Sequence, residues 1–172
     1  MHTMPIVWRL TEDEKQAVRA EARRRQETNA KKKLKGRNNG PETGDEALRV
    51  HLVGAAGEMA VASFLGLKEK VFSDTEAVRH SCDLPPDIDV KTRSRHYYDL
   101  LCQFDELPSK TLVLVTIENK TILLHGWIKA TEAMREKFKR EYVKGRPCYC
   151  MPKHELRPIQ SLQQYVDNAF LF

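Results

Sequence analysis

Residues 82–93 read Cys-Asp-Leu-Pro-Pro-Asp-Ile-Asp-Val-Lys-Thr-Arg, and the interpretation of the whole chain begins from them. From Ile88 onward apolar and charged residues alternate. This pattern predicts a half-buried strand, because successive side chains of a strand point to opposite faces. Asp89 and Lys91 then share one face, about 7 Å apart along the strand. A carboxylate and an ammonium group are therefore expected side by side.

A tight reversal is predicted just before this strand, because Pro85-Pro86 cannot continue a ladder of hydrogen bonds. With a loop from Pro85 to Asp87, Leu84 pairs with Ile88 and Asp83 lies opposite Asp89. Two carboxylates and one ammonium then converge on a single patch. Carboxylate oxygens suit Mg²⁺, and a nearby cation stabilises the charge that develops when a phosphate is attacked.

The segment from residue 45 or 46 to Leu65 is expected to be a buried helix, ended by Gly66. Its second half is almost entirely small or apolar, and its glycines and alanines allow close approach to a sheet. Glu58 is the exception within this apolar stretch. An ionised carboxylate there needs a partner or a metal, unless it points to solvent.

The composition favours a basic single-domain protein. Its 172 residues, 41% of them hydrophobic, are enough for one domain with a core. The net charge of +5 favours a polyanionic partner, with solubility as the alternative explanation. No run of residues is expected to span a membrane, and the start of the sequence lacks the pattern of a signal peptide, so a cytoplasmic location is expected. Cys148-Tyr149-Cys150 is interpreted as strand residues rather than as half of a zinc site.

The first part of the chain predicts a basic helix from Leu10 to about Lys35. Thr11 and Glu14 have the spacing of a capping box. The helix is dominated by charge, and its basic runs are expected to contact phosphates, with a solvated face as the alternative. These runs are Arg23, Arg24 and Arg25, followed by Lys31, Lys32 and Lys33. Residues 36–44 have the composition of a linker, so we divide the chain into residues 1–44 and a core of residues 45–172.

Beyond the buried helix, most of the chain is expected to form strands. Thr111 to Ile117 is a continuous apolar run, typical of a central strand, and Thr121 to Ile128 should return as its hairpin partner. Further strands are expected at 69–72, 77–83 and 148–151, a helix at 131–142, an amphipathic tail at 162–172, and irregular structure at 95–108. The fold class is therefore α/β, with helices around a mixed sheet.

The chain resembles the PD-(D/E)XK nuclease superfamily in three places that follow one another in order. These are residues 54–62 (Gly-Ala-Ala-Gly-Glu-Met-Ala-Val-Ala), then Asp83, then Asp89-Val90-Lys91. Acid-x-Lys occurs three times in this chain, but only here does it have alternating apolar flanks. The segments 126–128 and 151–156 are similar to those of uncharacterised, phage-encoded members. The resemblance covers roughly residues 48–156.

The resemblance implies a restriction-endonuclease-like fold and a Mg²⁺- or Mn²⁺-dependent endonuclease that acts on double-stranded or branched DNA. Asp83, Asp89 and the carbonyl of Val90 would hold the metal, Lys91 would position or activate the attacking water, and Glu58 would help to complete the site. Asp87 shares strand parity with Asp89 and is the alternative first ligand. We favour Asp83, since a residue across the turn shares a metal more easily than a neighbour on the same strand.

Substrate contacts beyond the catalytic group are expected from Arg93 and Arg95, together with the basic helix. The resemblance leaves open a structure-selective role in phage DNA processing, in the host cytoplasm, and a homodimer. A second hypothesis is a catalytically idle DNA- or RNA-binding module on the same fold, and a third is a nuclease that acts on RNA or a structural factor of a larger machine. The intact Asp-Val-Lys argues against the idle module.

Overall fold

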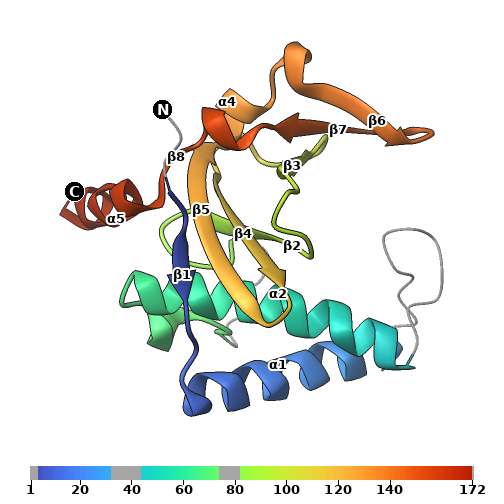
Figure 1. The fold of residues 1–172 in the computed structure, drawn as a ribbon, viewed down its shortest axis with the longest axis vertical. Coiled ribbons are helices and arrows are strands. Elements are labelled where there is room, and N and C mark those ends of the chain that lie inside the picture. Colours follow the sequence, from blue (N-terminus) through green and yellow to red (C-terminus); the bar gives the residue numbers. More distant parts are fainter. Residues whose placement is uncertain (1–3, 32–43, 74–81, 172) are drawn as a thin grey trace.

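The computed structural model describes residues 4–31, 44–73 and 82–171 of the chain. These residues form a mixed α/β structure with a larger sheet and a smaller one (Figure 1). The larger sheet has the strand order β1-β5-β4-β2, with β8 beside β5, and the smaller has the order β3-β7-β6. The strands are β1 Ile6–Trp8, β2 Ile88–Arg93, β3 Leu100–Gln103, β4 Thr111–Glu118, β5 Thr121–Lys129, β6 Lys139–Val143, β7 Arg146–Met151 and β8 Arg157–Pro158. The helices are α1 Glu12–Lys31, α2 Gly44–Phe64, α4 Ala130–Ala133 and α5 Leu162–Leu171, with short 3₁₀ turns at Lys68–Lys70, Glu136–Phe138, Lys153–Glu155 and Ile159–Ser161.

The strand and the reversal expected around Ile88 are confirmed. β2 pairs in parallel with β4, with Ile88 beside Thr111. Leu84 forms an antiparallel bridge with Ile88, so the chain does turn back on itself at this point. Because β4 and β5 are antiparallel, the larger sheet is mixed, as expected. Since β2 ends the strand order, one of its edges has no neighbouring strand among the described residues, apart from the bridge at Leu84.

A glycine sets the distance between α2 and β2. A Cβ on Gly57 would lie 1.9 Å from Thr92 Oγ1, so only a residue without a side chain allows the helix to lie this close to the strand. The next residue, Glu58, is thereby held beside the strand. The helix ends as expected: Gly66 has a φ of +69°, and the Leu67 N–H donates to the Ala62 carbonyl at 2.8 Å.

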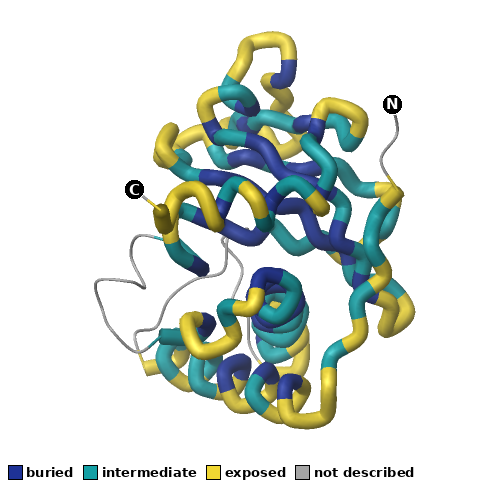
Figure 2. Tube along the Cα trace, turned by 90° about the vertical axis from the view of Figure 1, so that its left-hand side faces the viewer, coloured by how far each residue is buried: buried dark blue, intermediate teal, exposed yellow. Residues whose placement is uncertain are grey.

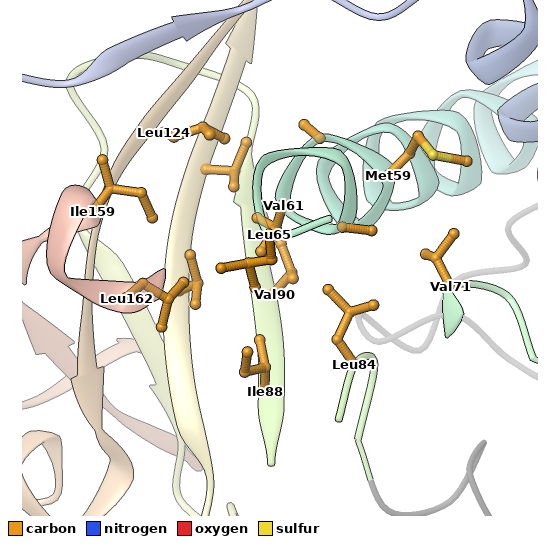
Figure 3. Close-up of a cluster of buried hydrophobic side chains, with 14 of the residues drawn as sticks. Met59, Val61, Leu65, Val71, Leu84, Ile88, Val90, Leu124, Ile159 and Leu162 are labelled. Carbon is orange, nitrogen blue, oxygen red and sulfur yellow. The ribbon is translucent and has the colours of Figure 1, made fainter. Parts of the chain in front are cut away.

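Two apolar clusters hold these layers together. The first lies between α2 and the larger sheet and includes Val61, Val90 and Leu124 (Figure 3). The second includes Leu100, Leu112 and Leu114, and it joins the opposite face of the larger sheet to the smaller sheet and α4. Figure 2 shows the buried positions gathered in α2 and in the strands. The face of β2 that carries Asp89 and Lys91 therefore looks toward the smaller sheet.

The basic helix is confirmed as α1, and it is not purely a surface element. Thr11 and Glu14 form the expected capping box, with the Thr11 N–H on Glu14 Oε2 at 2.9 Å and the Glu14 N–H on Thr11 Oγ1 at 3.2 Å. Val18 and Ala22 are buried, and α1 runs alongside α2 (Figure 1). β1, which the sequence did not suggest, pairs with β5. Lys32, Lys33 and the segment 36–43 lie outside the described residues.

Three other expectations were wrong. Residues 68–70 form a 3₁₀ turn in place of the start of a strand, because Lys68, Glu69 and Lys70 are all exposed and offer no apolar face. The stretch 95–108 contains β3, whose Leu100 and Cys102 are buried in the second cluster. The helix expected at 131–142 stops at Ala133, since the residues after it pair as β6 with β7 and this pairing outweighs local helix propensity. Most of the strand expected at 77–83 lies outside the described residues.

By length and hydropathy, residues Gly44–Leu65 could cross a membrane, contrary to the expectation that no segment could. In the structure this helix lies between α1 and the larger sheet, and 44% of its most apolar window is buried within the protein. Packing as a core helix accounts for its apolar composition.

Candidate active site

The reversal before β2 brings Asp83 to the unpaired edge of that strand. Asp83 Oδ2 accepts a hydrogen bond from the Val90 N–H at 2.7 Å, and the Asp83 N–H donates to the Ile88 carbonyl at 2.9 Å. Because the N–H and C=O groups of a strand residue point to the same side, the Val90 carbonyl faces the same edge. Asp83 and Val90 thus lie together where β2 has no neighbouring strand.

The pKa of Asp83 reflects its burial and its acidic surroundings. Burial, then the charge of Glu58, and then the charge of Asp89 raise the pKa of Asp83 to about 7. The Val90 N–H and the ammonium of Lys91 act in the opposite direction and do not cancel the increase. Three carboxyl groups from α2, the turn and β2 therefore interact at one place, although 25 residues separate Glu58 from Asp83 in the sequence.

Glu58 is buried and is held by a residue of α1. Its two carboxylate oxygens accept from Arg25 Nη1 at 3.0 Å and Arg25 Nη2 at 2.6 Å. Arg25 Nε also donates to Glu21 Oε1 at 2.8 Å. Burial alone would lower the pKa of Arg25, but Glu58 and Glu21 together raise it. The partner that the apolar setting of Glu58 required is thus an arginine of the basic helix.

Lys91 lies in a small network of charges on the face of β2 that is turned away from α2. Its Nζ donates to Glu106 Oε2 at 2.6 Å and lies 3.6 Å from Asp89 Oδ2. Lys110 Nζ donates to the same Asp89 oxygen at 2.7 Å and lies 3.4 Å from Glu106 Oε1. Burial would raise the pKa of Glu106, but Lys91 and Lys110 outweigh it and lower the pKa. Glu106 therefore stays ionised and fixes the position of the Lys91 ammonium.

Asp87, the alternative first ligand, is directed to a different network. Its Oδ2 accepts from Lys129 Nζ and from the Tyr165 hydroxyl, each at 2.7 Å. Lys129 Nζ also donates to Thr111 Oγ1 at 2.9 Å. These contacts tie the turn before β2 to β5 and α5. The structure thus groups Asp83, and not Asp87, with Glu58 and Asp89.

The residues expected to bind nucleic acid are spread over several environments. On α1, Arg23 and Lys31 are exposed, whereas Arg24 and Arg25 both contact Glu21. The two arginines at the end of β2 and just after it also differ from each other. Arg93 donates to the Asp99 carbonyl at 2.8 Å and lies over the Tyr98 ring, and Arg95 is half exposed, 3.7 Å from Glu118.

The donor chemistry of the site fits a hard divalent cation, but its carboxylates have cationic partners within the protein. Across residues 4–31, 44–73 and 82–171, no three histidine, cysteine, aspartate or glutamate side chains stand ready to hold one metal ion. Glu58 contacts Arg25, and Asp89 contacts Lys110. Four carboxyl groups (Glu58, Asp83, Asp89 and Glu106) nevertheless meet three cationic groups here (Arg25, Lys91 and Lys110), and the charges of Glu58 and Asp89 add to burial in raising the pKa of Asp83. A divalent cation would offset this negative charge.

The sequence did not identify Glu106 and Lys110 as members of this site, and it predicted phosphate contact for Arg25 rather than contact with Glu58. The apolar neighbours of Glu58 in the sequence showed that it needs a partner, but no nearby residue indicated Arg25, which lies 33 positions earlier. Glu106 and Lys110 lie in the connection between β3 and β4 and contact Lys91 and Asp89 of β2. Such contacts between separate segments produce no periodic pattern in the sequence. Comparison of the chain with models of protein families, with curated proteins and with solved structures finds no match.

Proposed function

We propose that this protein is a metal-dependent DNA endonuclease that hydrolyses phosphodiester bonds, on a restriction-endonuclease-like fold of the PD-(D/E)XK type. The observation that carries the proposal is the meeting of Asp83, Asp89 and Glu58 beside Lys91 at the unpaired edge of β2. A buried carboxyl group with a raised pKa, such as that of Asp83, close to other carboxylates and a lysine marks a candidate catalytic site.

In this proposal, Asp83, Asp89 and the carbonyl of Val90 hold Mg²⁺ or Mn²⁺. Such a cation lowers the pKa of a water molecule and offsets charge on a phosphate. In this proposal Asp89 leaves Lys110 to contact the cation, and Glu58, which is paired with Arg25, helps to complete the site. With the surplus negative charge offset, the phosphate backbone of DNA can approach the carboxylates.

Lys91 contributes the group that acts on the reacting phosphate or on the attacking water. Its side chain is largely buried and held by Glu106, so its ammonium is positioned before substrate arrives. We assign Glu106 as a positioning residue, because it acts through Lys91. Stabilisation of charge that develops only in the transition state raises the rate of the chemical step.

A catalytically idle nucleic-acid-binding module is the second candidate, and one observation favours it. Arg25 and Lys110 already neutralise Glu58 and Asp89 within the protein. A module without chemistry would keep these pairs permanently. An enzyme would exchange them for a divalent cation, so Mg²⁺ should stabilise the enzyme against unfolding and leave the idle module unchanged.

The experiment that tests the proposal offers supercoiled, linear, branched and single-stranded DNA to the purified protein with Mg²⁺, Mn²⁺ or EDTA. We expect cleavage of at least one DNA form with either metal and none in EDTA. Asp89→Asn should be inactive, and Lys70→Gln, a change in the exposed 3₁₀ turn after α2, should be fully active. Binding without cleavage of any DNA form with either metal would favour the idle module.

A further inference from the structure

A second polar cluster lies farther along the same face of β2. Arg93 is two residues after Lys91, so it points to the same side of the sheet, and its neighbour in β4 is Thr116. Thr116 is fully buried, yet its hydroxyl contacts two imidazoles. His96 Nδ1 lies 2.7 Å from Thr116 Oγ1, and His125 Nε2 lies 2.6 Å from it. The sequence shows no relation between these histidines.

The shared hydroxyl determines how the two imidazoles present their protons. A threonine hydroxyl has one proton, so it can donate to only one of the two rings and must accept from the other. The ring that accepts carries its own N–H on its other nitrogen. When both rings are neutral, one of them therefore keeps an N–H that Thr116 does not use. Both His96 and His125 are half-buried.

His125 lies at an irregularity in the ladder between β4 and β5. Leu114 pairs with Gly126 and Val115 pairs with Leu124, so His125 is the extra residue of a β-bulge. Leu124 is buried in the cluster against α2, so the alternation of strand side chains places His125 on the opposite face, where it contacts Thr116. Bulges often redirect one side chain beside a functional site, although that association alone assigns no role.

Cationic groups surround the two imidazoles. Lys153, in the 3₁₀ turn after β7, is half-buried, and within the described part of the chain its ammonium has no hydrogen bond or ion pair. Burial, then Lys153 and His96, lower the pKa of His125 to about 4, so it is neutral at pH 7. Burial also lowers the pKa of Lys153, with Asp99 opposing the effect and Arg93 adding to it. These groups would all interact favourably with an anion.

The acidic groups in this region already have partners. Asp99 Oδ1 accepts from the Lys153 backbone N–H at 3.2 Å. Glu118 Oε2 accepts from the His96 backbone N–H at 3.0 Å, and its other oxygen lies 3.7 Å from Arg95. Neither carboxylate forms an ion pair with the Lys153 ammonium. Asp99 acts on Lys153 through its charge, but within the described residues the Lys153 ammonium forms no ion pair.

We propose that Arg93, His96, His125 and Lys153 bind a phosphate of the nucleic-acid backbone, next to the one at Lys91. Arg93 and Lys153 supply charge, and one imidazole supplies a directed N–H. The common face of β2 places this phosphate site beside the catalytic group, so it fixes the register of the strand to be cut. The inference rests on the proposed function for its ligand, because only a polynucleotide would fill both positions at once.

The test compares Lys153→Gln with Lys70→Gln, which removes the same charge from an exposed turn. Binding of a short duplex DNA is titrated in EDTA over a series of salt concentrations, so cleavage does not enter. Lys153→Gln should weaken binding several-fold and reduce the slope of log affinity against log salt by about one. Lys153→Arg, which keeps the charge, should restore most of the affinity, and thermal unfolding of each variant checks that it folds.

A second probe separates two sources of phosphate. Inorganic phosphate is added while the imidazole resonances of His96 and His125 are followed by NMR. Shifts of these signals that are lost in Lys153→Gln, together with the weaker duplex binding, support the proposal. Equal duplex binding by Lys153→Gln and Lys70→Gln overturns it, whether or not free phosphate shifts the signals. If Lys91→Ala binds duplex DNA normally but does not cleave it, the phosphate site at Lys153 is still supported. If the unmodified protein does not cleave DNA, only the proposed chemistry is overturned.

Discussion

The guanidinium of Arg25 contacts both carboxylate oxygens of Glu58, at 3.0 and 2.6 Å. This pair joins α1 to α2, and the charge of Glu58 in turn acts on the carboxyl group of Asp83. The basic helix is therefore part of the candidate site as well as a surface for phosphates. Its arginines have different roles, since Arg23 is exposed on the same helix.

Replacing Arg25 should destabilise the fold. We expect Arg25→Gln to lower the free energy of unfolding by about 3 kcal/mol, because Glu58 is left buried without its charged partner. Arg23→Gln, the matched control on the exposed side of α1, should change it by less than about 0.5 kcal/mol. Urea denaturation in EDTA measures both. Mg²⁺ should then raise the Tm of Arg25→Gln more than that of the unmodified protein, and equal shifts would argue against a part for Glu58 in the metal site.

Asp83 should make stability depend on pH. Its pKa is raised from 3.8 to about 7 in the folded chain, so the folded state binds this proton more tightly than the unfolded state does. The contribution is fully present below the unfolded pKa and is lost as pH rises toward 7 and above. Asp83→Asn keeps an acceptor for the Val90 N–H and removes this loss. In EDTA at pH 8 the variant should be more stable than the unmodified protein.

The quantity to measure is the difference in unfolding free energy between Asp83→Asn and the unmodified protein from pH 4 to pH 8. Other groups with altered pKa values, such as His125, contribute equally to both proteins and cancel in the difference. The difference should grow in favour of the variant as pH rises. A constant difference across this range would show that Asp83 does not titrate there.

The sequence alone predicts those parts of the fold that depend on a few neighbouring residues. The alternation after Ile88, the proline pair before it and the glycine stop at Gly66 are each a property of a few neighbouring residues, and the structure contains all three features. The residues that complete the site could not be predicted from such local patterns. Arg25 reaches Glu58 across two helices, and Glu106 reaches Lys91 from a connection without periodicity, so only tertiary packing brings them together.

Replacing Asp83 should affect mainly the proposed cleavage activity, whereas replacing Asp87 should affect mainly stability. Asp87→Asn should retain most of the proposed cleavage activity but lose about 1–2 kcal/mol of stability, because its contacts with Lys129 and Tyr165 weaken. Asp83→Asn should fold and lose metal-dependent cleavage. Parallel cleavage assays and thermal unfolding distinguish the two. The reverse assignment of activity would move the metal ligand to Asp87.

Close packing of α2 on β2 should be sensitive to one methyl group. A Cβ at Gly57 would lie 1.9 Å from Thr92 Oγ1, so Gly57→Ala should cost about 1–3 kcal/mol and displace Glu58 from the strand. Thr92→Ala in the same chain removes that oxygen and should recover part of the loss. Calorimetric unfolding of the single and double variants measures the coupling, and simple additivity of the two changes would contradict the contact.

The central claim is that Lys91 acts on a phosphate held at the edge of β2. The most direct measurement is single-turnover cleavage, in which the complex of protein and DNA is formed in EDTA and reaction is started with excess Mg²⁺. Lys91→Ala should bind the DNA as tightly as Lys70→Ala does, yet cleave it at least about a hundredfold more slowly. Cleavage by Lys91→Ala at the rate of Lys70→Ala would contradict the assignment of this site.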